Sequence, residues 1–253
     1  MNGVQNRLTA RQDEDGVLTV AFCEPSRLNA VTHKTLQALR QLLDQPCRAL
    51  VLTGTGRAFS AGQDLEELAA LTEDSSWSPD EHLALFQELT ERLLAHPSPT
   101  VAAINGVAVG FGAEIALACD VRIAADSARM GFVEVARGLF QTNGVTWLLP
   151  RLVGHGRAAD LLLTGEILDA DSLERWGLAT RRCSDEQLSE VAASVAARLA
   201  AGHPLSRELI RKALEVTWSQ PLGSMMQREV EGMKRCLAAG AAGEGARAFV
   251  SSR

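Results

Sequence analysis

The sequence has no excess of positive charge and no long apolar segment. It contains 25 Lys and Arg against 31 Asp and Glu, a formal net charge of −6, and this balance gives no indication of nucleic-acid binding. No run of about 18 apolar residues occurs, so we expect no membrane-spanning helix. The first twelve residues are polar and do not resemble a secretory signal peptide. These absences predict a cytoplasmic protein that binds neither nucleic acid nor membrane.

The sequence also lacks a cluster of cysteines or histidines. The five cysteines, Cys23, Cys47, Cys119, Cys183 and Cys236, include no CxxC pair, and an odd number without metal-ligand spacing predicts reduced, buried thiols. The five histidines share no motif, and we expect each to be structural: His33, His82, His96, His155 and His203. Ser60 has no nearby His–Asp partner set, which disfavours a serine hydrolase.

What remains is the composition of a globular protein. The chain has 253 residues, of which 46% are hydrophobic and 22% charged, enough for one large core or for a domain with an appendage. Strand and helix patterns alternate along the first part of the chain, and only helical patterns follow residue 183. We therefore expect an α/β core domain over residues 1–200 and a helical region over residues 201–253.

The expected elements are short and closely spaced. Strands are predicted at 6–12, 16–22, 49–53, 100–104, 121–125, 128–131 and 179–183. Helices are predicted at 32–43, 65–71, 80–96, from 113 onward, and at 145–152, 156–163, 184–201, 204–218, 222–237 and 243–250. Pro150 is expected to interrupt its helix. Residues 132–144 are predicted to be irregular, and residues 72–79 to form a mobile loop whose Trp77 packs on the surface.

One stretch, Val101 to Asp120, combines a strand, a glycine turn and a helix. A short apolar strand ends at Asn105-Gly106, and Gly110-Phe111-Gly112 precede a helical pattern. Glycines let another group approach the backbone closely, and the first turn of a helix leaves N–H groups unpaired. Such a turn can bind an anion or a developing oxyanion. Glu114 lies in this turn, where it is either a reactive carboxylate or only a favourable charge.

A second stretch, Arg57 to Leu65, follows the same plan. Small residues at Ser60, Ala61 and Gly62 follow a strand and a glycine turn, and a helix pattern begins at Leu65. Two strand–loop–helix units of this kind could direct two N–H groups at one oxygen, as the enolate of a thioester requires. The alternative is that both loops are merely tight turns.

Four motifs occur in an order that resembles the crotonase superfamily, the enoyl-CoA hydratase/isomerase group. They are Pro25-Ser26-Arg27-Leu28-Asn29-Ala30, the AFSAGQDL loop, INGVAVGFGAEIALACD, and Gly131-Phe132-Val133-Glu134. The resemblance covers residues 4–253 and is closest to enoyl-CoA hydratase. It implies an α/β fold, a spiral of ββα units with a helical C-terminal oligomerisation region, and no metal or redox cofactor.

The resemblance also implies an oxyanion hole. Gln63, the residue after Gly62, would give one backbone N–H, and Phe111, between Gly110 and Gly112, would give the other. Both side chains are larger than the small residues common at these positions in the family. A bulky Phe111 is expected to reshape the acyl pocket.

Glu114 and Glu134 are the candidate acid–base pair. They are 20 residues apart, the spacing of the enoyl-CoA hydratases that the chain resembles. Hydrating a C=C bond conjugated to a thioester requires a base that activates water at C3 and an acid that protonates C2. Two carboxylates in one apolar pocket raise at least one pKa and can supply both roles. The alternative for Glu134 is a structural cap or an ion pair with Arg137.

Coenzyme A is expected as part of the substrate rather than as a separate cofactor. By resemblance, Arg27, Leu28, Ala30, Ser60, Ala61, Asp64 and Gly110 flank the CoA thioester, and Arg27 suits a phosphate because its guanidinium matches phosphate geometry. Asp64 and Asp120 are otherwise expected to cap backbone N–H groups. Arg253 is a weaker candidate for a phosphate contact because chain ends often fray.

The predicted function is the reversible syn-hydration of a 2-enoyl-CoA. Residues 139–144, Leu-Phe-Gln-Thr-Asn-Gly, replace a proline- and glycine-rich loop of many hydratases. A Δ3,Δ2-enoyl-CoA isomerase or another crotonase-type lyase is therefore an alternative, and a non-catalytic CoA-thioester-binding protein is an alternative of another class. The resemblance and the apolar C-terminal helices predict a homotrimer or a homohexamer.

Overall fold

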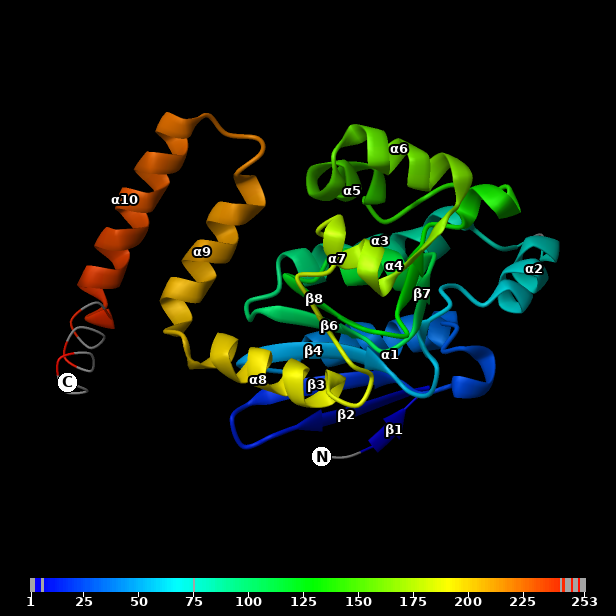
Figure 1. Ribbon diagram of the computed structural model, residues 1–253, viewed down its shortest axis with the longest axis horizontal. Coiled ribbons are helices and arrows are strands. Elements are labelled where there is room, and N and C mark those ends of the chain that lie inside the picture. The colour runs from blue at the N-terminus through cyan, green and yellow to red at the C-terminus, as the bar shows by residue number, and fades with distance from the viewer. Residues whose placement is uncertain are drawn as a thin grey trace.

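Two β-sheets form the body of the computed structural model (Figure 1), which describes residues 3–5, 7–74, 76–241, 243, 247 and 250. The larger sheet has seven strands in the order β1-β2-β3-β4-β6-β8-β11. Its strands are β1 Gly3–Gln5, β2 Leu8–Gln12, β3 Val17–Phe22, β4 Ala49–Gly54, β6 Thr100–Ile104, β8 Val121–Ala125 and β11 Arg181–Cys183. The pairs from β3 to β11 are parallel, whereas β1, β2 and β3 form an antiparallel ribbon.

A smaller sheet has four strands in the order β10-β9-β7-β5. Its strands are β5 Ala58–Ser60, β7 Val107–Val109, β9 Arg129–Gly131 and β10 Ile167–Asp169. Consecutive strands alternate between the sheets: β4, β6 and β8 pair in the larger one, and β5, β7 and β9, which follow them, pair in the smaller one. This alternation produces the predicted spiral, in which successive turns of the chain stack strand upon strand.

The helices follow the turns of the spiral. They are α1 His33–Leu43, α2 Leu65–Glu73, α3 Pro79–Leu94, α4 Phe111–Leu117, α5 Val145–Val153, α6 His155–Thr164, α7 Ala170–Arg175, α8 Leu188–Ala201, α9 Pro204–Val216 and α10 Leu222–Ala238, with 3₁₀ turns η1 Pro25–Arg27 and η2 Glu134–Arg137. Thr32 caps α1, as predicted, because its side chain accepts a hydrogen bond from the N–H of Thr35.

Some expectations about local structure were wrong. Pro150 lies inside α5 without interrupting it. It removes only the hydrogen bond to the carbonyl of Thr146, which is an exposed residue where water can replace the lost donor. Strands β1, β5, β7 and β10 and helix α7 were not predicted, since three to six residues are too few to show a period. Of the five cysteines, all free, only Cys119 is buried, and the other four are half-buried.

The parallel strands bury both faces. In β4, Leu50 and Leu52 face the main core, which α1, α3 and α4 complete, whereas Ala49 and Val51 face α8. This period of two continues in the neighbouring strands and accounts for the uninterrupted apolar run from Ala49 to Leu52. The body therefore has two apolar layers. The main core, which contains Leu50 and Leu52, supports the loops between β5 and α2 and between β7 and α4.

Helices α9 and α10 stand beside the body as an antiparallel pair (Figure 1) and have no buried residue. Arg211 of α9 connects them to it, because its guanidinium lies 2.9 Å from Asp120 and donates to the carbonyls of Leu93 and Leu94. The helix predicted at 243–250 lies largely outside the described residues, as does Arg253.

Candidate active site

Two loops meet backbone to backbone at the ends of β5 and β7. A Cβ atom added to Gly112 would lie 2.2 Å from the carbonyl oxygen of Ser60, and one added to Gly62 would lie 2.8 Å from the oxygen of Val109. Real side chains do not approach so closely, so glycine at both positions permits the contact. The two strand–loop–helix units recognised in the sequence are therefore one structural unit.

This contact brings together the backbone N–H groups of Gln63 and Phe111. A Cβ atom added to Gly62, next to Gln63, would lie 3.0 Å from the nitrogen of Phe111. Gly110 has φ 54° and ψ −130°, a conformation for glycine, and α4 begins directly after it. Within the described chain, neither N–H donates to a protein acceptor. Both are available to a ligand oxygen.

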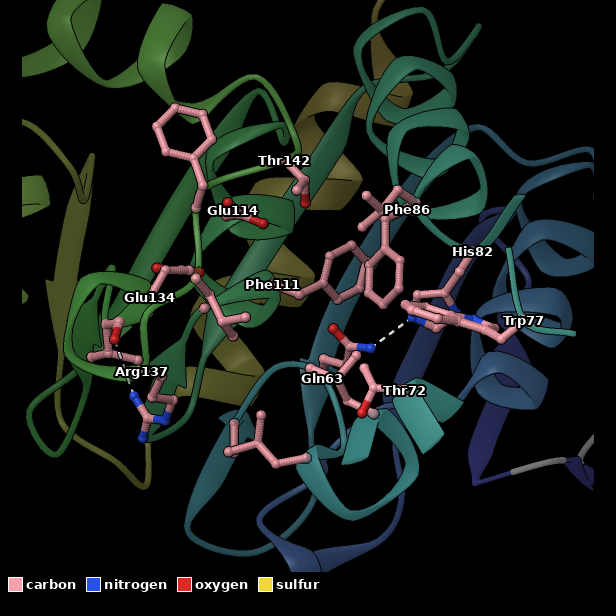
Figure 2. Close-up of a pocket in the computed structure, with 18 residues that line it drawn as sticks. Gln63, Thr72, Trp77, His82, Phe86, Phe111, Glu114, Glu134, Arg137 and Thr142 are labelled. Atoms are coloured by element: carbon pink, nitrogen blue, oxygen red, sulfur yellow. Dashed lines mark hydrogen bonds between the residues drawn. The ribbon is translucent and has the colours of Figure 1, made fainter. Parts of the chain in front are cut away.

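A cavity of about 400 Å³ lies beside these loops (Figure 2). Its lining includes Gln63, Gly110 and Phe111 from the two loops, Glu114 from α4 and Glu134 from η2. The volume is within the usual range for small-molecule sites. The four residues predicted to do chemistry thus border one space.

Glu114 is buried, with 3% of its surface exposed. Its Oε2 accepts a hydrogen bond from Nδ2 of Asn143, and its Oε1 has no partner among the described residues. Burial raises its pKa to about 7, the hydrogen bond from Asn143 opposes this, and the nearby charge of Glu134 adds to it. Glu114 can therefore take up or release a proton near neutral pH.

Glu134 approaches the same loop from the other side. A Cβ atom added to Gly110 would lie 3.3 Å from its Oε1, and its Oε2 has no partner in the described part of the chain. Burial raises its pKa, although a backbone hydrogen bond, Gln141 and Arg137 oppose this. Arg137 lies too far from Glu134 for a direct ion pair in the described structure: its guanidinium donates to the carbonyl of Val133, 3.2 Å away. The alternative of a Glu134–Arg137 ion pair is therefore not supported.

Three residues that line or support the cavity were not among the predicted site residues. His82, expected to be structural, borders the cavity, and its Nε2 lies 2.6 Å from Nε2 of Gln63. Trp77, expected on the surface, is half-buried, lines the cavity and packs edge-on against His82. Asn143 was passed over as part of an irregular segment. His82 could have been noticed, since it lies on the buried face of α3 with Phe86 and Leu89.

Except for Gly110, the residues predicted to flank CoA occupy one pair of hydrogen-bonded loops. The N–H of Ala61 donates to the carbonyl of Leu28, and the hydroxyl of Ser60, which is buried, donates to that of Asn29. Among the predicted CoA contacts, Ala61 and Gly110 line the cavity; Arg27, Leu28, Ala30, Ser60 and Asp64 lie outside its lining.

Asp64 and Arg27 are already paired within the protein. Asp64 caps α2 by accepting from the N–H groups of Glu66 and Glu67, as expected of a structural aspartate. Arg27 lies 2.5 Å from Glu66 and 3.5 Å from Asp64. A phosphate contact by Arg27 would therefore compete with these carboxylates.

Two other kinds of feature are absent from the described residues. No group of three or more His, Cys, Asp or Glu side chains there is arranged to hold a metal ion. Over the same residues, no helix has the length and hydrophobicity needed to cross a membrane.

Comparison with known proteins agrees with the geometry. The sequence model of the enoyl-CoA hydratase/isomerase family matches residues 12–253. The 1,2-epoxyphenylacetyl-CoA isomerase of Escherichia coli is 34% identical over 95% of this chain and 94% of its own length. The crotonyl-CoA hydratase of Syntrophomonas wolfei is 31% identical over 96% and 94%. The crystal structure of an enoyl-CoA hydratase from Bacillus anthracis superimposes with a TM-score of 0.90 at 29% identity, covering 98% of this chain and 97% of that one.

Proposed function

This chain belongs to the enoyl-CoA hydratase/isomerase family, and we propose that it catalyses the reversible syn-hydration of a 2-enoyl-CoA to a 3-hydroxyacyl-CoA. One observation carries the proposal. Glu114 and Glu134, from different elements, border one cavity next to two free N–H groups, and each has a buried carboxyl oxygen without a partner in the described residues. Such oxygens are the places where a reacting water can bind.

The two carboxyl groups each carry out one of the two proton transfers of the hydration. The oxygen of a water molecule forms a bond to C3 of the enoyl group, while one glutamate takes the proton that the water loses. The other glutamate delivers its own proton to C2. Because burial brings the pKa of Glu114 to about 7 and raises that of Glu134, the pair can hold one ionised and one protonated carboxyl group near neutral pH.

The two N–H groups have the complementary role. As water adds to C3, negative charge develops on the thioester oxygen, and the N–H groups of Gln63 and Phe111 would donate to it. Fixed donors need no reorganisation during the reaction, and the loss of one typically slows such reactions by about 10² to 10³-fold. In this proposal, coenzyme A only carries the acyl group. Proton transfer and oxyanion stabilisation are sufficient for the hydration.

A second candidate is the movement of a double bond within an acyl-CoA, which needs one carboxylate to carry a proton between two carbons. The observation that favours it is the hydrogen bond from Asn143, which occupies one oxygen of Glu114 and leaves only the other to exchange a proton. A relative with almost full coverage is named as an isomerase.

The test uses the wild-type protein and two substrates. Crotonyl-CoA loses the absorbance of its conjugated double bond on hydration, whereas a 3-enoyl-CoA gains it on isomerisation. Hydration of a 2-enoyl-CoA supports the proposal. Isomerisation of a 3-enoyl-CoA without hydration of any 2-enoyl-CoA would replace it by the second candidate. Binding without either reaction would indicate a non-catalytic CoA-thioester-binding protein.

A further inference from the structure

Aromatic residues are scarce in this chain and concentrated in one cavity. The chain has 4 tryptophans, 7 phenylalanines and no tyrosine among 253 residues. Four of these eleven rings, those of Trp77, Phe86, Phe111 and Phe140, are among the 18 residues that line the cavity. An even distribution would place about one ring there. The cavity wall is therefore unusually aromatic for this protein.

Three of these rings and one imidazole form a continuous row. Phe111 packs edge-to-face on Phe86 at 4.8 Å and 87°, Phe86 packs on His82 at 5.2 Å, and His82 packs on Trp77 at 5.6 Å. Figure 2 shows the row leading away from Phe111, whose N–H is proposed to bind the thioester oxygen, on the side opposite the two glutamates. Because the row and the two glutamates line one cavity, an acyl group bound there would lie between them, with its outer part against the row.

The row carries no charge where it borders the cavity. The side-chain amide of Gln63 donates to Nε2 of His82 at 2.6 Å, and burial, together with the nearby His33, lowers the pKa of His82. A neutral imidazole with a satisfied nitrogen presents mainly its ring. The remaining wall adds aliphatic side chains, including Leu65, Leu68, Leu83, Val133 and Leu139.

A fourth ring of the lining, that of Phe140, has unburied apolar surface. Phe140 is 75% exposed although it lines the cavity. Its ring surface therefore remains available to cover a bound group. At about 400 Å³ the cavity is near the lower end of the usual range for ligand sites, which suits a compact acyl group better than a long chain.

We propose that the acyl group of the substrate carries an aromatic ring, which packs against Trp77 and the neighbouring rings Phe86 and Phe111. The proposal rests on the function proposed above, since it names the acyl group for the same site. Edge-to-face and offset-stacked contacts favour a ring over an alkyl chain beyond their buried area. The aromatic row would thus make the site prefer aromatic over alkyl acyl groups.

The first experiment measures binding without turnover. Isothermal titration compares 3-phenylpropanoyl-CoA with nonanoyl-CoA, which have equal numbers of acyl carbons and no double bond to hydrate. We expect the phenyl compound to bind at least about tenfold more tightly, the sum of several ring contacts. Equal affinity, or tighter binding of nonanoyl-CoA, would overturn the proposal without any variant being needed.

The second experiment tests whether Trp77 causes the preference for the phenyl thioester. Trp77→Leu should reduce the affinity ratio of the two thioesters by about three- to tenfold. The matched control is Trp147→Leu, since Trp147 is 44% exposed and lies outside this cavity, and it should leave the ratio unchanged. The same ratio in both variants would contradict the assignment to Trp77.

Failure of this proposal differs from failure of the proposed function. Hydration of crotonyl-CoA together with equal binding of the two nine-carbon thioesters would refute the aromatic acyl group and support the hydratase function. Tighter binding of the phenyl compound without turnover of cinnamoyl-CoA or crotonyl-CoA would refute the hydratase function and support the aromatic acyl group.

Discussion

Asn143 donates a hydrogen bond from its Nδ2 to Oε2 of Glu114, although the two residues are 29 positions apart. This bond favours the ionised form of Glu114, as does the backbone of Thr142, whereas burial and the charge of Glu134 favour the protonated form. Burial dominates, and the pKa of Glu114 rises to about 7. Asn143 therefore limits how far the pKa rises.

Replacing Asn143 should change the pH dependence of the reaction. In Asn143→Leu, which has nearly the same shape, the ionised carboxylate loses its donor, so the pKa of Glu114 should rise by roughly one further unit. The measurement is kcat/KM for hydration between pH 5 and 9. Its lower apparent pKa should move upward with the variant, and an unchanged profile would show that Asn143 does not act on the titrating group.

The raised pKa of Glu114 also predicts how stability depends on pH. A folded-state pKa of about 7 against an ordinary value of 4.5 means that the folded state binds more protons between these values. The free energy of unfolding therefore falls as pH rises through this window, by roughly 3 to 4 kcal/mol in all and by roughly 2 to 3 kcal/mol between pH 5 and pH 8. Urea denaturation of the wild type and Glu114→Gln at pH 5 and pH 8 measures it. The wild type should lose this much relative to the variant, and a constant difference would contradict the raised pKa.

Gly62 provides a test of the oxyanion site. A methyl group there would lie 2.8 Å from the oxygen of Val109 and 3.0 Å from the nitrogen of Phe111, so Gly62→Ala should separate the loops or block the N–H. We expect kcat to fall by at least about a hundredfold. Gly240→Ala is the control: its φ is also positive, at 75°, but its methyl group would meet nothing within 4 Å. It should cost about 1 kcal/mol of stability and no activity. Equal activity of the two variants would exclude a role for this N–H.

The faces of α9 and α10 predict self-association. Their exposed apolar residues are Ile210, Leu214, Leu222, Met226, Val230, Met233 and Leu237, and we propose that they pack against other copies in a trimer or a hexamer. Light scattering at micromolar concentration tests this. Leu222→Glu should shift the assembly toward monomer, whereas Leu163→Glu, equally exposed at 75%, should not. A monomeric wild type would refute the assembly.

The fold could be predicted because its longer elements have clear periods and its glycine motifs occur in a recognisable order. Strand β4 and helix α1 lie within a residue of their predicted bounds. Strand β5 could not be predicted: it has three residues, and only pairing with β7, far along the chain, makes it a strand. The same limit explains Pro150, because the sequence does not show that the carbonyl left unpaired belongs to an exposed residue.

The site divides in the same way. Glu114, Gln63 and Phe111 lie within the loop motifs and could be identified from the sequence. His82 and Asn143 contact them across 19 and 29 residues, and no local pattern reports such contacts. The residues that surround the reacting groups, unlike those groups themselves, can therefore be identified only from the folded structure.

The two glutamates give the most direct test of hydration. Glutamine preserves the shape of glutamate but cannot exchange a proton, and general acid or base groups typically contribute about 10² to 10⁴-fold each. Glu114→Gln and Glu134→Gln should each lower crotonyl-CoA hydration by at least about a hundredfold, with circular dichroism confirming that both fold. Because both carboxyl groups border one cavity and would serve one water molecule, the double variant should be little worse than the worse single variant.

The same variants separate hydration from isomerisation. A double-bond shift needs one proton carrier, so one of the two glutamates should be dispensable for a 3-enoyl-CoA, whereas hydration should need both. Glu67→Gln is a suitable control, since Glu67 accepts a hydrogen bond from the backbone of His33 and does not line the cavity; it should retain activity. If Glu134→Gln retained near wild-type hydration, Glu134 would have no part in the reaction, and a single glutamate, Glu114, would have to carry the proton.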